Sequence, residues 1–444
     1  MPALYIPGVP DRVPENARTV QPAAEAGPGN FAGFTILGSC AGVVRFLYRP
    51  VAAGAGASMK IFQCQACDQP VSFESTACES CERRLGYVCD RHEVSALEPC
   101  GEDGRGPLFR AYAHPGRKYR PCANAAFEAC NWMVPEDSPE AYCVTCRHNR
   151  VVPDLSVGSN LERWRQIEAA KHRLFYSLLR LDLPLVTRVQ YSDGLAFDFL
   201  AETAGPPVMT GHLDGLITLS IAEADDVERE RRRTLFGEYY RTLLGHFRHE
   251  IGHYFWNLLV RYDPSLPAYR ALFGDESLDY GAALRHHHAA GPPSDWSESF
   301  VSSYATAHPW EDFAETFAHY LHIVDTLETA SAFEIRLRPK LRAKTEPAVA
   351  STCIDFDPYE TPDFQRVIEA WLPLTYAMNS LNRSMGQPPL YPFKLAPAVI
   401  AKLAFVHERI YAVRAPGGLT EVASAEMLKA VIAGLRQRVA APTA

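Results

Sequence analysis

The chain has 444 residues, of which 47 % are apolar and 22 % are charged, a composition typical of globular proteins. This length favours two or more domains. The formal net charge of −8 argues against a general nucleic-acid binder, because such proteins are usually basic. The sequence contains neither a run of about twenty apolar residues nor a secretory signal, so we expect neither a membrane-spanning segment nor export.

The first part of the chain differs in composition from the rest. Residues 1–58 are rich in Pro, Gly and Ala and contain few apolar residues at regular spacing. We therefore expect them to be a disordered or mis-assigned leader rather than a functional arm. The cysteine-rich part follows directly after Met59, which is a candidate for the true start of the protein.

Cysteines are concentrated in residues 59–150, which hold ten of the 12. Two C-x-x-C pairs separated by ten residues are typical of a zinc ribbon, in which each tight turn directs two thiolates at one ion. The predicted ligands of this first structural zinc are Cys64, Cys67, Cys78 and Cys81. Bound metal would replace the hydrophobic core that such a small module lacks.

A second group of four cysteines falls within 25 residues and has less regular spacing. The predicted ligands of a second structural zinc are Cys122, Cys130, Cys143 and Cys146. Cys89 and Cys100 are then left over, and we interpret them as ordinary thiols rather than further ligands. Zinc-binding thiolates without an export signal predict a cytoplasmic protein.

The remainder, residues 155–440, is predicted to form a mostly helical domain with a small sheet, which makes the fold class α+β. Apolar residues recur at helical spacing over 159–181. Short strands separated by turn sequences such as Asp-Gly are predicted at 185–190, 196–199 and 216–221. The last strand is a candidate for pairing with an extended substrate, although plain membership of the sheet is the default interpretation. Further apolar stripes predict helices at 364–374 and 400–413.

The pattern H-E-x-x-H occurs at residues 249–253, inside a stretch whose apolar residues recur at helical spacing from Phe236 to Asp263. On a helix, the imidazoles of His249 and His253 project from one face and can bind a single zinc ion. The carboxylate of Glu250 can then reach a water bound to that ion and act as general base. The pattern therefore predicts a catalytic zinc site.

Zinc in such a site needs a third protein ligand, and the segment after His308 offers one. Pro309 is suited to begin a helix on which Glu311 and Glu315 share one face, with the small Ala314 between them. Two carboxylates beside an apolar stripe are costly to bury without a cation. We therefore expect Glu311 to bind zinc and Glu315 to accept the outer N–H of a ligand histidine. His308 remains an alternative ligand.

Other histidines near these motifs receive structural interpretations. The run 286–288 lies in a polar stretch bounded by Gly and Pro, which favours a solvent-exposed loop over a ligand role. His319 and His322 share the predicted helix of Glu311 and are interpreted as packing or hydrogen-bonding residues. The case for a role of His246 beside the metal or the substrate is weak.

The motif E-x-x-A-E-x-F downstream of H-E-x-x-H resembles the gluzincin endopeptidases, and closely those of the lethal-factor type. In that type the first glutamate binds zinc and a tyrosine seven residues earlier stabilises the oxyanion, so the resemblance implies these roles for Glu311 and Tyr304. The wider chain, about 59–415, resembles a bacterial family of zinc-binding metallopeptidases with an N-terminal zinc ribbon. The stretches that carry this resemblance are 130–132, 195–200, 211–218, 222–231, 246–254 and 308–328.

Together these features predict a zinc-dependent peptidase with Glu250 as general base and Tyr304 as oxyanion donor. One catalytic and two structural zinc ions are expected, with a peptide or protein as substrate. Two rivals remain open: a binding or regulatory protein whose zinc ribbons recognise a protein partner with little turnover, and a zinc amidohydrolase acting on non-peptide amides. The spans between the cysteines lack a dense Lys/Arg run, which argues against nucleic acid as a partner.

Overall fold

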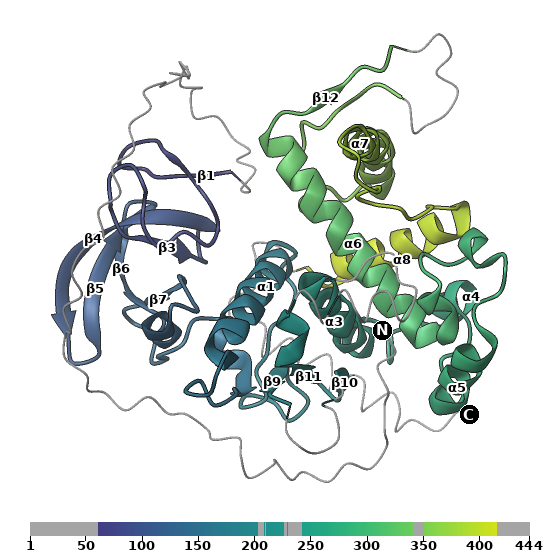
Figure 1. Ribbon diagram of the computed structural model, residues 1–444, viewed down its shortest axis with the longest axis horizontal. Coiled ribbons are helices and arrows are strands. Elements are labelled where there is room, and N and C mark those ends of the chain that lie inside the picture. The colour runs from purple at the N-terminus through teal and green to yellow at the C-terminus, as the bar shows by residue number, and fades with distance from the viewer. Residues whose placement is uncertain are drawn as a thin grey trace.

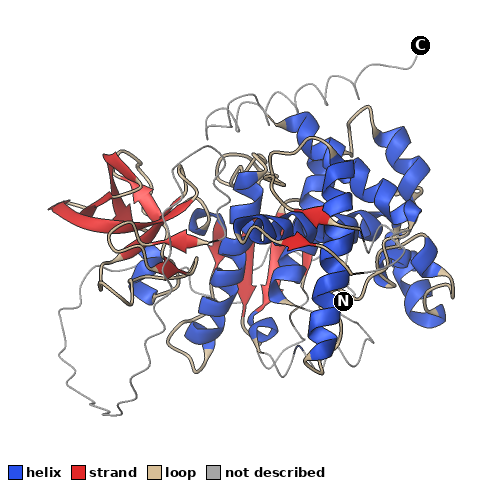
Figure 2. Cartoon of the chain, turned by 90° about the horizontal axis from the view of Figure 1, so that it is seen from above, coloured by secondary structure: helices blue, strands red, loops and turns tan. Residues whose placement is uncertain are grey.

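The computed structural model describes residues 61–202, 208, 210–225, 229, 242–340 and 350–414. The predicted leader lies outside these residues, as does the part of the predicted metal helix before residue 242. The α+β prediction is confirmed, because a β-rich unit at one end of the molecule is followed by a second sheet and then by a helical part (Figures 1 and 2). None of the described helices combines the length and the apolar character needed to cross a membrane.

The β-rich unit at the N-terminal end consists of a small hairpin and a five-stranded antiparallel meander. The hairpin pairs β1 (Phe62–Gln63) with β2 (Pro70–Val71). The meander runs in chain order through β3 (Leu85–Val88), β4 (Glu93–Asp103), β5 (Gly106–Ala111), β6 (His114–Pro121) and β7 (Met133–Pro135). The cysteine spacing does not predict this sheet, since its first four strands lie between the two cysteine groups.

A second, four-stranded sheet follows the β-rich unit and lies next to the helices, below them in Figure 1. Its order is β10 (Gly211–Leu213), β11 (Leu216–Ser220), β9 (Ala196–Leu200) and β8 (Asn149–Val151). Both β8 and β11 run parallel to β9, whereas β10 is antiparallel to β11. The strands predicted at 196–199 and 216–221 are thus confirmed, and the long helix predicted at 159–181 is α1 (Asn160–Arg180).

The strand predicted at 185–190 is wrong. The side chain of Gln190 accepts a hydrogen bond from the backbone N–H of Thr187 at 2.9 Å, and the N–H of Gln190 donates back to the Thr187 carbonyl at 3.0 Å. These bonds close a turn, so the segment contributes only an isolated bridge between Thr187 and Leu195. Local side-chain bonding of this kind competes with strand pairing.

The hairpin of β10 and β11 determines which strand can meet a substrate. Asp214 and Gly215 both have positive φ values, 44° and 83°, which is the two-residue turn that matches the twist of an antiparallel pair. Because β11 is hydrogen-bonded to β9 on one side and to β10 on the other, it cannot also pair with a substrate, and the default interpretation of 216–221 as a strand of the sheet is confirmed. Among the described strands, β10 forms that edge of the sheet.

The helical part packs around two long helices, α3 and α6, which lie side by side (Figure 1). Its helices are α3 (Leu243–Leu259), α4 (Leu266–Phe273), α5 (Tyr280–Ala290), α6 (Pro309–Ala332), α7 (Phe364–Ser384) and α8 (Pro397–Val413). The helices predicted at 364–374 and 400–413 are confirmed as parts of α7 and α8. The short strands β12 (Arg336–Leu337) and β13 (Thr352–Cys353) form a separate pair.

Gly252 allows α3 and α6 to approach closely. A Cβ atom at this position would lie 2.9 Å from the Cα of Ala314, which is closer than Cβ atoms come to non-bonded atoms in proteins. The small residues at both positions therefore let the helix backbones meet where His249 and His253 face Glu311 and Glu315. The pattern H-E-x-G-H thus carries a packing requirement in addition to its chemistry.

Candidate metal centre

His249 and His253 lie one turn apart on α3, and both side chains are buried. The helix is capped at its start by Thr242, whose hydroxyl accepts a hydrogen bond from the N–H of Gly245 at 2.9 Å. The Nε2 atoms of the two imidazoles lie 3.2 Å apart. The helical spacing of the two histidines therefore brings both Nε2 atoms to one point, as the sequence predicts.

Glu311 reaches the same point from α6. Pro309 occupies the first turn of this helix and the side chain of His308 caps it, accepting a hydrogen bond from the N–H of Trp310 at 3.1 Å. The Oε2 atom of Glu311 is 3.0 Å from Nε2 of His249 and 3.5 Å from Nε2 of His253. The Glu311 side chain is fully buried.

These three atoms fit a zinc ion. Ligand atoms about 2.0–2.2 Å from a tetrahedral zinc lie about 3.3–3.6 Å from one another, close to the separations between His249, His253 and Glu311. Oε2 of Glu311 is buried and accepts no hydrogen bond from a described residue, so this atom is unsatisfied without a cation. Two imidazoles and one carboxylate are also a donor set that zinc prefers.

Glu315 lies behind His249, on the side away from Glu311. Its Oε1 atom is 2.6 Å from Nδ1 of His249, and its Oε2 accepts a hydrogen bond from the hydroxyl of Ser302 at 2.6 Å. Burial alone would raise the pKa of Glu315, but the bond from His249 outweighs it and lowers the pKa to about 2. The carboxylate is therefore charged and can fix the imidazole with Nε2 toward the metal position.

Glu250 and Tyr304 lie at the same centre with unsatisfied polar atoms. Oε2 of Glu250 and the hydroxyl of Tyr304 are both buried and have no hydrogen-bond partner among the described residues. Tyr304 begins the short 3₁₀ helix η5 (Tyr304–Ala307), and its ring centre is 5.9 Å from that of His249. Burial and the nearby Glu311 hold the pKa of Tyr304 well above its usual value, so the phenol keeps its proton and can donate a hydrogen bond.

Three further residues contact the candidate metal ligands and were not expected from the sequence. The hydroxyl of Tyr280, on α5, donates a hydrogen bond to Oε1 of Glu311. The indole of Trp310 packs on the ring of His253, with centres 4.1 Å apart, and His212 of β10 stacks on the same imidazole at 6.1 Å. Tyr280 and His212 reach the site only through the packing of α5 and β10, so no spacing rule connects them to the motif. Trp310 directly precedes Glu311 on α6 and is brought to the site with it.

The other histidines near the motifs have separate partners. The run 286–288 belongs to α5 and not to a loop; Asp279 caps this helix and the ring of His287 contacts the hydroxyl of Thr306 at 3.1 Å. His308 uses Nδ1 in the helix cap and Nε2 toward the Leu278 carbonyl at 3.2 Å, so neither nitrogen faces the metal position.

Hydrogen bonding also accounts for the two remaining histidines of α6, whereas His246 only lies near a carboxylate. His319 contacts the hydroxyl of Tyr391 at 2.7 Å, and His322 accepts a hydrogen bond from Arg248 at 2.6 Å. His246 lies 3.5 Å from a carboxylate oxygen of Glu223.

Each predicted cysteine group converges on one point. The sulfur atoms of Cys64 and Cys81 are 3.7 Å apart and those of Cys67 and Cys78 are 3.5 Å apart. In the second group, the sulfur atoms of its middle two cysteines are 3.7 Å apart, and all four lie within 4.8 Å of one another. Sulfur atoms about 2.3 Å from a tetrahedral zinc are about 3.8 Å apart, so both groups fit that ion. Cys89 and Cys100 belong to no such group among the described residues.

Comparisons with known proteins match two regions of the chain. Residues 61–157 match a zinc-ribbon domain family. Uncharacterized proteins of Mycobacterium tuberculosis and Mycobacterium bovis are each 42 % identical over 351 residues, which cover 79 % of this chain and 94 % of the relative. No solved structure matches the chain. Residues 160–409 match the family described as "putative zinc-binding metallo-peptidase", and the chain belongs to that family.

Proposed function

We propose that the protein is a zinc-dependent peptidase of the gluzincin type. The observation that carries this proposal is the convergence of His249 Nε2, His253 Nε2 and Glu311 Oε2 within 3.0–3.5 Å of one another, next to the unsatisfied carboxylate of Glu250. The two cysteine groups would each hold a structural zinc, giving three ions per chain. Reduced thiolate sites of this kind are typical of the cytoplasm, which supports a cytoplasmic location.

The residues of the chain divide the reaction between them. Zinc, when bound, would polarise water and the substrate carbonyl. Glu250 takes the proton from the attacking water and later gives it to the leaving amine. Tyr304 donates its phenolic hydrogen to the oxyanion, and Glu315 keeps His249 oriented toward the metal. The apolar environment of these groups strengthens each electrostatic contact.

The edge strand β10 supports a peptide substrate over another amide. It is antiparallel to β11, forms one edge of the described sheet and carries His212, which stacks on His253. An extended peptide can add to such an edge through backbone hydrogen bonds, which would place it beside the metal centre. If so, methylation of substrate backbone nitrogens that pair with β10 should weaken cleavage by blocking those bonds.

The test compares the zinc-loaded wild type with Glu250→Gln. Each protein is incubated with a bacterial protein extract, and new peptide termini are identified by mass spectrometry. We expect new termini with the wild type only, while both proteins hold the same amount of zinc, because the substitution removes the base and leaves the three ligands in place. Equal cleavage by the variant would overturn the proposed mechanism.

The same experiment distinguishes the rival functions. A binding or regulatory protein would produce no new termini with either form, and its zinc-ribbon region would be the part that retains a protein from the extract. A zinc amidohydrolase would also leave the proteins of the extract intact, but would hydrolyse small amides in a way that depends on Glu250.

A further inference from the structure

The second cysteine group contacts a histidine that lies outside the zinc-ribbon region. His172 is on α1, in the part of the chain that matches the metallopeptidase family, and it is buried. Its Nε2 atom lies 3.2 Å from the sulfur of Cys130, 3.7 Å from that of Cys146 and 4.0 Å from that of Cys143. The imidazole thus covers a surface formed by three of the four sulfur atoms.

The other nitrogen of His172 determines what Nε2 can do. Nδ1 is 2.6 Å from the carbonyl oxygen of Glu168, one turn earlier on α1. A carbonyl can only accept, so Nδ1 carries a hydrogen. Zinc-bound thiolates also only accept, and four cysteines already complete the tetrahedral shell of zinc. Nε2 therefore meets the cluster as an N–H donor, and a hydrogen bond to a thiolate is strengthened by the charge on the sulfur.

The residues around His172 fix α1 to the same place. Lys171 is fully buried and donates to Oε1 of Glu168 at 2.8 Å, and the side-chain amide of Asn149, at the start of β8, donates to the same oxygen at 2.8 Å. The ring of Trp132 packs against His172 with centres 5.2 Å apart. Buried polar groups with this many mutual bonds favour a single arrangement of the elements that carry them.

We propose that the second zinc site joins the two parts of the molecule, with His172 of α1 capping the thiolates of the zinc-ribbon region through Nε2–H···S hydrogen bonds. Zinc at this site would then hold the ribbon region against α1. Since α1 packs directly on α3, the site also supports the helix that carries His249 and His253 (Figure 1).

The first test replaces His172 by Phe, which keeps a ring against Trp132 but has no N–H group, and by Gln, which retains an N–H donor. A chelator competition measures zinc affinity. In His172→Phe we expect one zinc per chain to bind about 10- to 100-fold more weakly, the usual effect of losing a partner of a metal ligand. His172→Gln should recover much of this loss. Unchanged affinity in His172→Phe would overturn the proposal.

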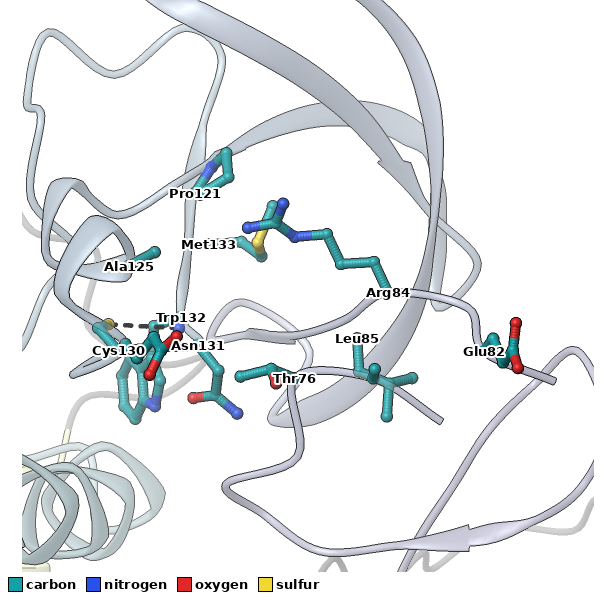
Figure 3. A pocket seen from close by; sticks show the side chains of 12 residues that line it. Thr76, Glu82, Arg84, Leu85, Pro121, Ala125, Cys130, Asn131, Trp132 and Met133 are labelled. Carbon is teal, nitrogen blue, oxygen red and sulfur yellow. Dashed lines mark hydrogen bonds between the residues drawn. The ribbon is translucent and has the colours of Figure 1, made fainter. Parts of the chain in front are cut away.

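The affected site is identified by cysteine alkylation and peptide mapping. Cys130 lies on the wall of an open cavity of about 650 Å³, beside Trp132 (Figure 3). The backbone N–H of Trp132 donates a hydrogen bond to the sulfur of Cys130 at 3.3 Å. In His172→Phe, the second cysteine group should be alkylated faster while Cys64 and Cys78 keep the wild-type rate. Equal acceleration at both groups would mean general loosening and would contradict a specific role of His172.

Two controls separate the cap from other roles of a buried histidine. His148→Phe makes the same ring replacement nearby; His148 is buried, bonds to the Val144 carbonyl at 2.8 Å and packs on Phe175. A loss of zinc affinity in this variant equal to that of His172→Phe would refute the cap. Cobalt substitution then tests the ligand set. The cobalt spectra of the wild type and of His172→Phe should both show the bands of four thiolate ligands. If the wild type shows a nitrogen-ligand signature that His172→Phe lacks, His172 is a ligand and not a cap.

The link to α1 is tested by amide hydrogen exchange. In the wild type, removing zinc from the second cysteine group should speed exchange in the part of α1 around His172. In His172→Phe this part should exchange faster even with zinc bound. Exchange in α1 that does not respond to zinc in either protein would show that the site does not join the two parts.

Discussion

The bond between Glu315 and His249 gives a sharp prediction for zinc affinity. The contact is 2.6 Å long, its carboxylate is charged, and the side chain is only 19 % exposed. A hydrogen bond to a charged group contributes about 1.5–3 kcal/mol, and each 1.4 kcal/mol is a factor of ten in binding. Removing the carboxylate in Glu315→Ala should therefore weaken zinc binding at the catalytic centre by about 10- to 150-fold.

A milder substitution at Glu315 should weaken zinc binding less. Glu315→Gln keeps an oxygen acceptor for His249 and loses only the charge. Its loss of zinc affinity should therefore lie near the lower end of that range. The assay is competition for zinc between the protein and a fluorescent chelator. Only one of the zinc ions of each chain should bind more weakly. Glu298→Gln is the matched control, because it removes a carboxylate that contacts Lys394 at the same length of 2.6 Å on the exposed surface. If Glu315→Ala binds zinc as tightly as this control, the assigned role of Glu315 is wrong.

Four further predictions concern the surroundings of the centre. Gly252→Ala places a Cβ 2.9 Å from Ala314, so unfolding should show a loss of about 1–3 kcal/mol together with weaker zinc binding. Tyr280→Phe removes the hydrogen bond to Glu311 and should weaken zinc binding about fivefold. Tyr304→Phe should leave zinc affinity unchanged and lower kcat by about 100-fold. Burial lowers the pKa of His319 to about 4, so the stability it contributes is present above pH 6.5 and is lost as the pH falls toward 4. Urea unfolding of His319→Gln should then be less sensitive to pH, by about 2 kcal/mol between pH 7 and pH 5, and equal pH dependence in both proteins would contradict this.

The parts of the site that the sequence predicts share a helical origin. His249 and His253 meet because residues four apart lie on one face of a helix, and the same rule places Glu311 and Glu315 on one face of α6. Each pair needs only local geometry, so spacing in the sequence is sufficient. The cysteine groups follow the same logic in part, since each C-x-x-C turn directs two sulfur atoms at one point.

The residues that escaped prediction reach the site through long-range packing. Tyr280 lies 31 positions before Glu311 and meets it only because α5 folds back beside the start of α6. Ser302 likewise contacts Glu315 across 13 positions. The turn at Thr187 is a local exception, in which the Gln190 side chain bonds to the backbone three residues earlier and replaces the expected strand. In each case the deciding contact depends on a partner that sequence spacing does not identify.

The relation between the metal sites follows from the same distinction between local and long-range contacts. The four cysteines of the second group could form a site within the zinc-ribbon region alone, but Nε2 of His172, on α1, lies 3.2 Å from the sulfur of Cys130. Three residues after His172, α1 continues the core toward α3, because Phe175 packs on Phe197 and Phe197 packs on Phe247. Phe247 lies two residues before His249. A short series of buried contacts therefore connects the second cysteine group to α3. Replacing His172 should consequently speed amide hydrogen exchange in α3 as well as in α1.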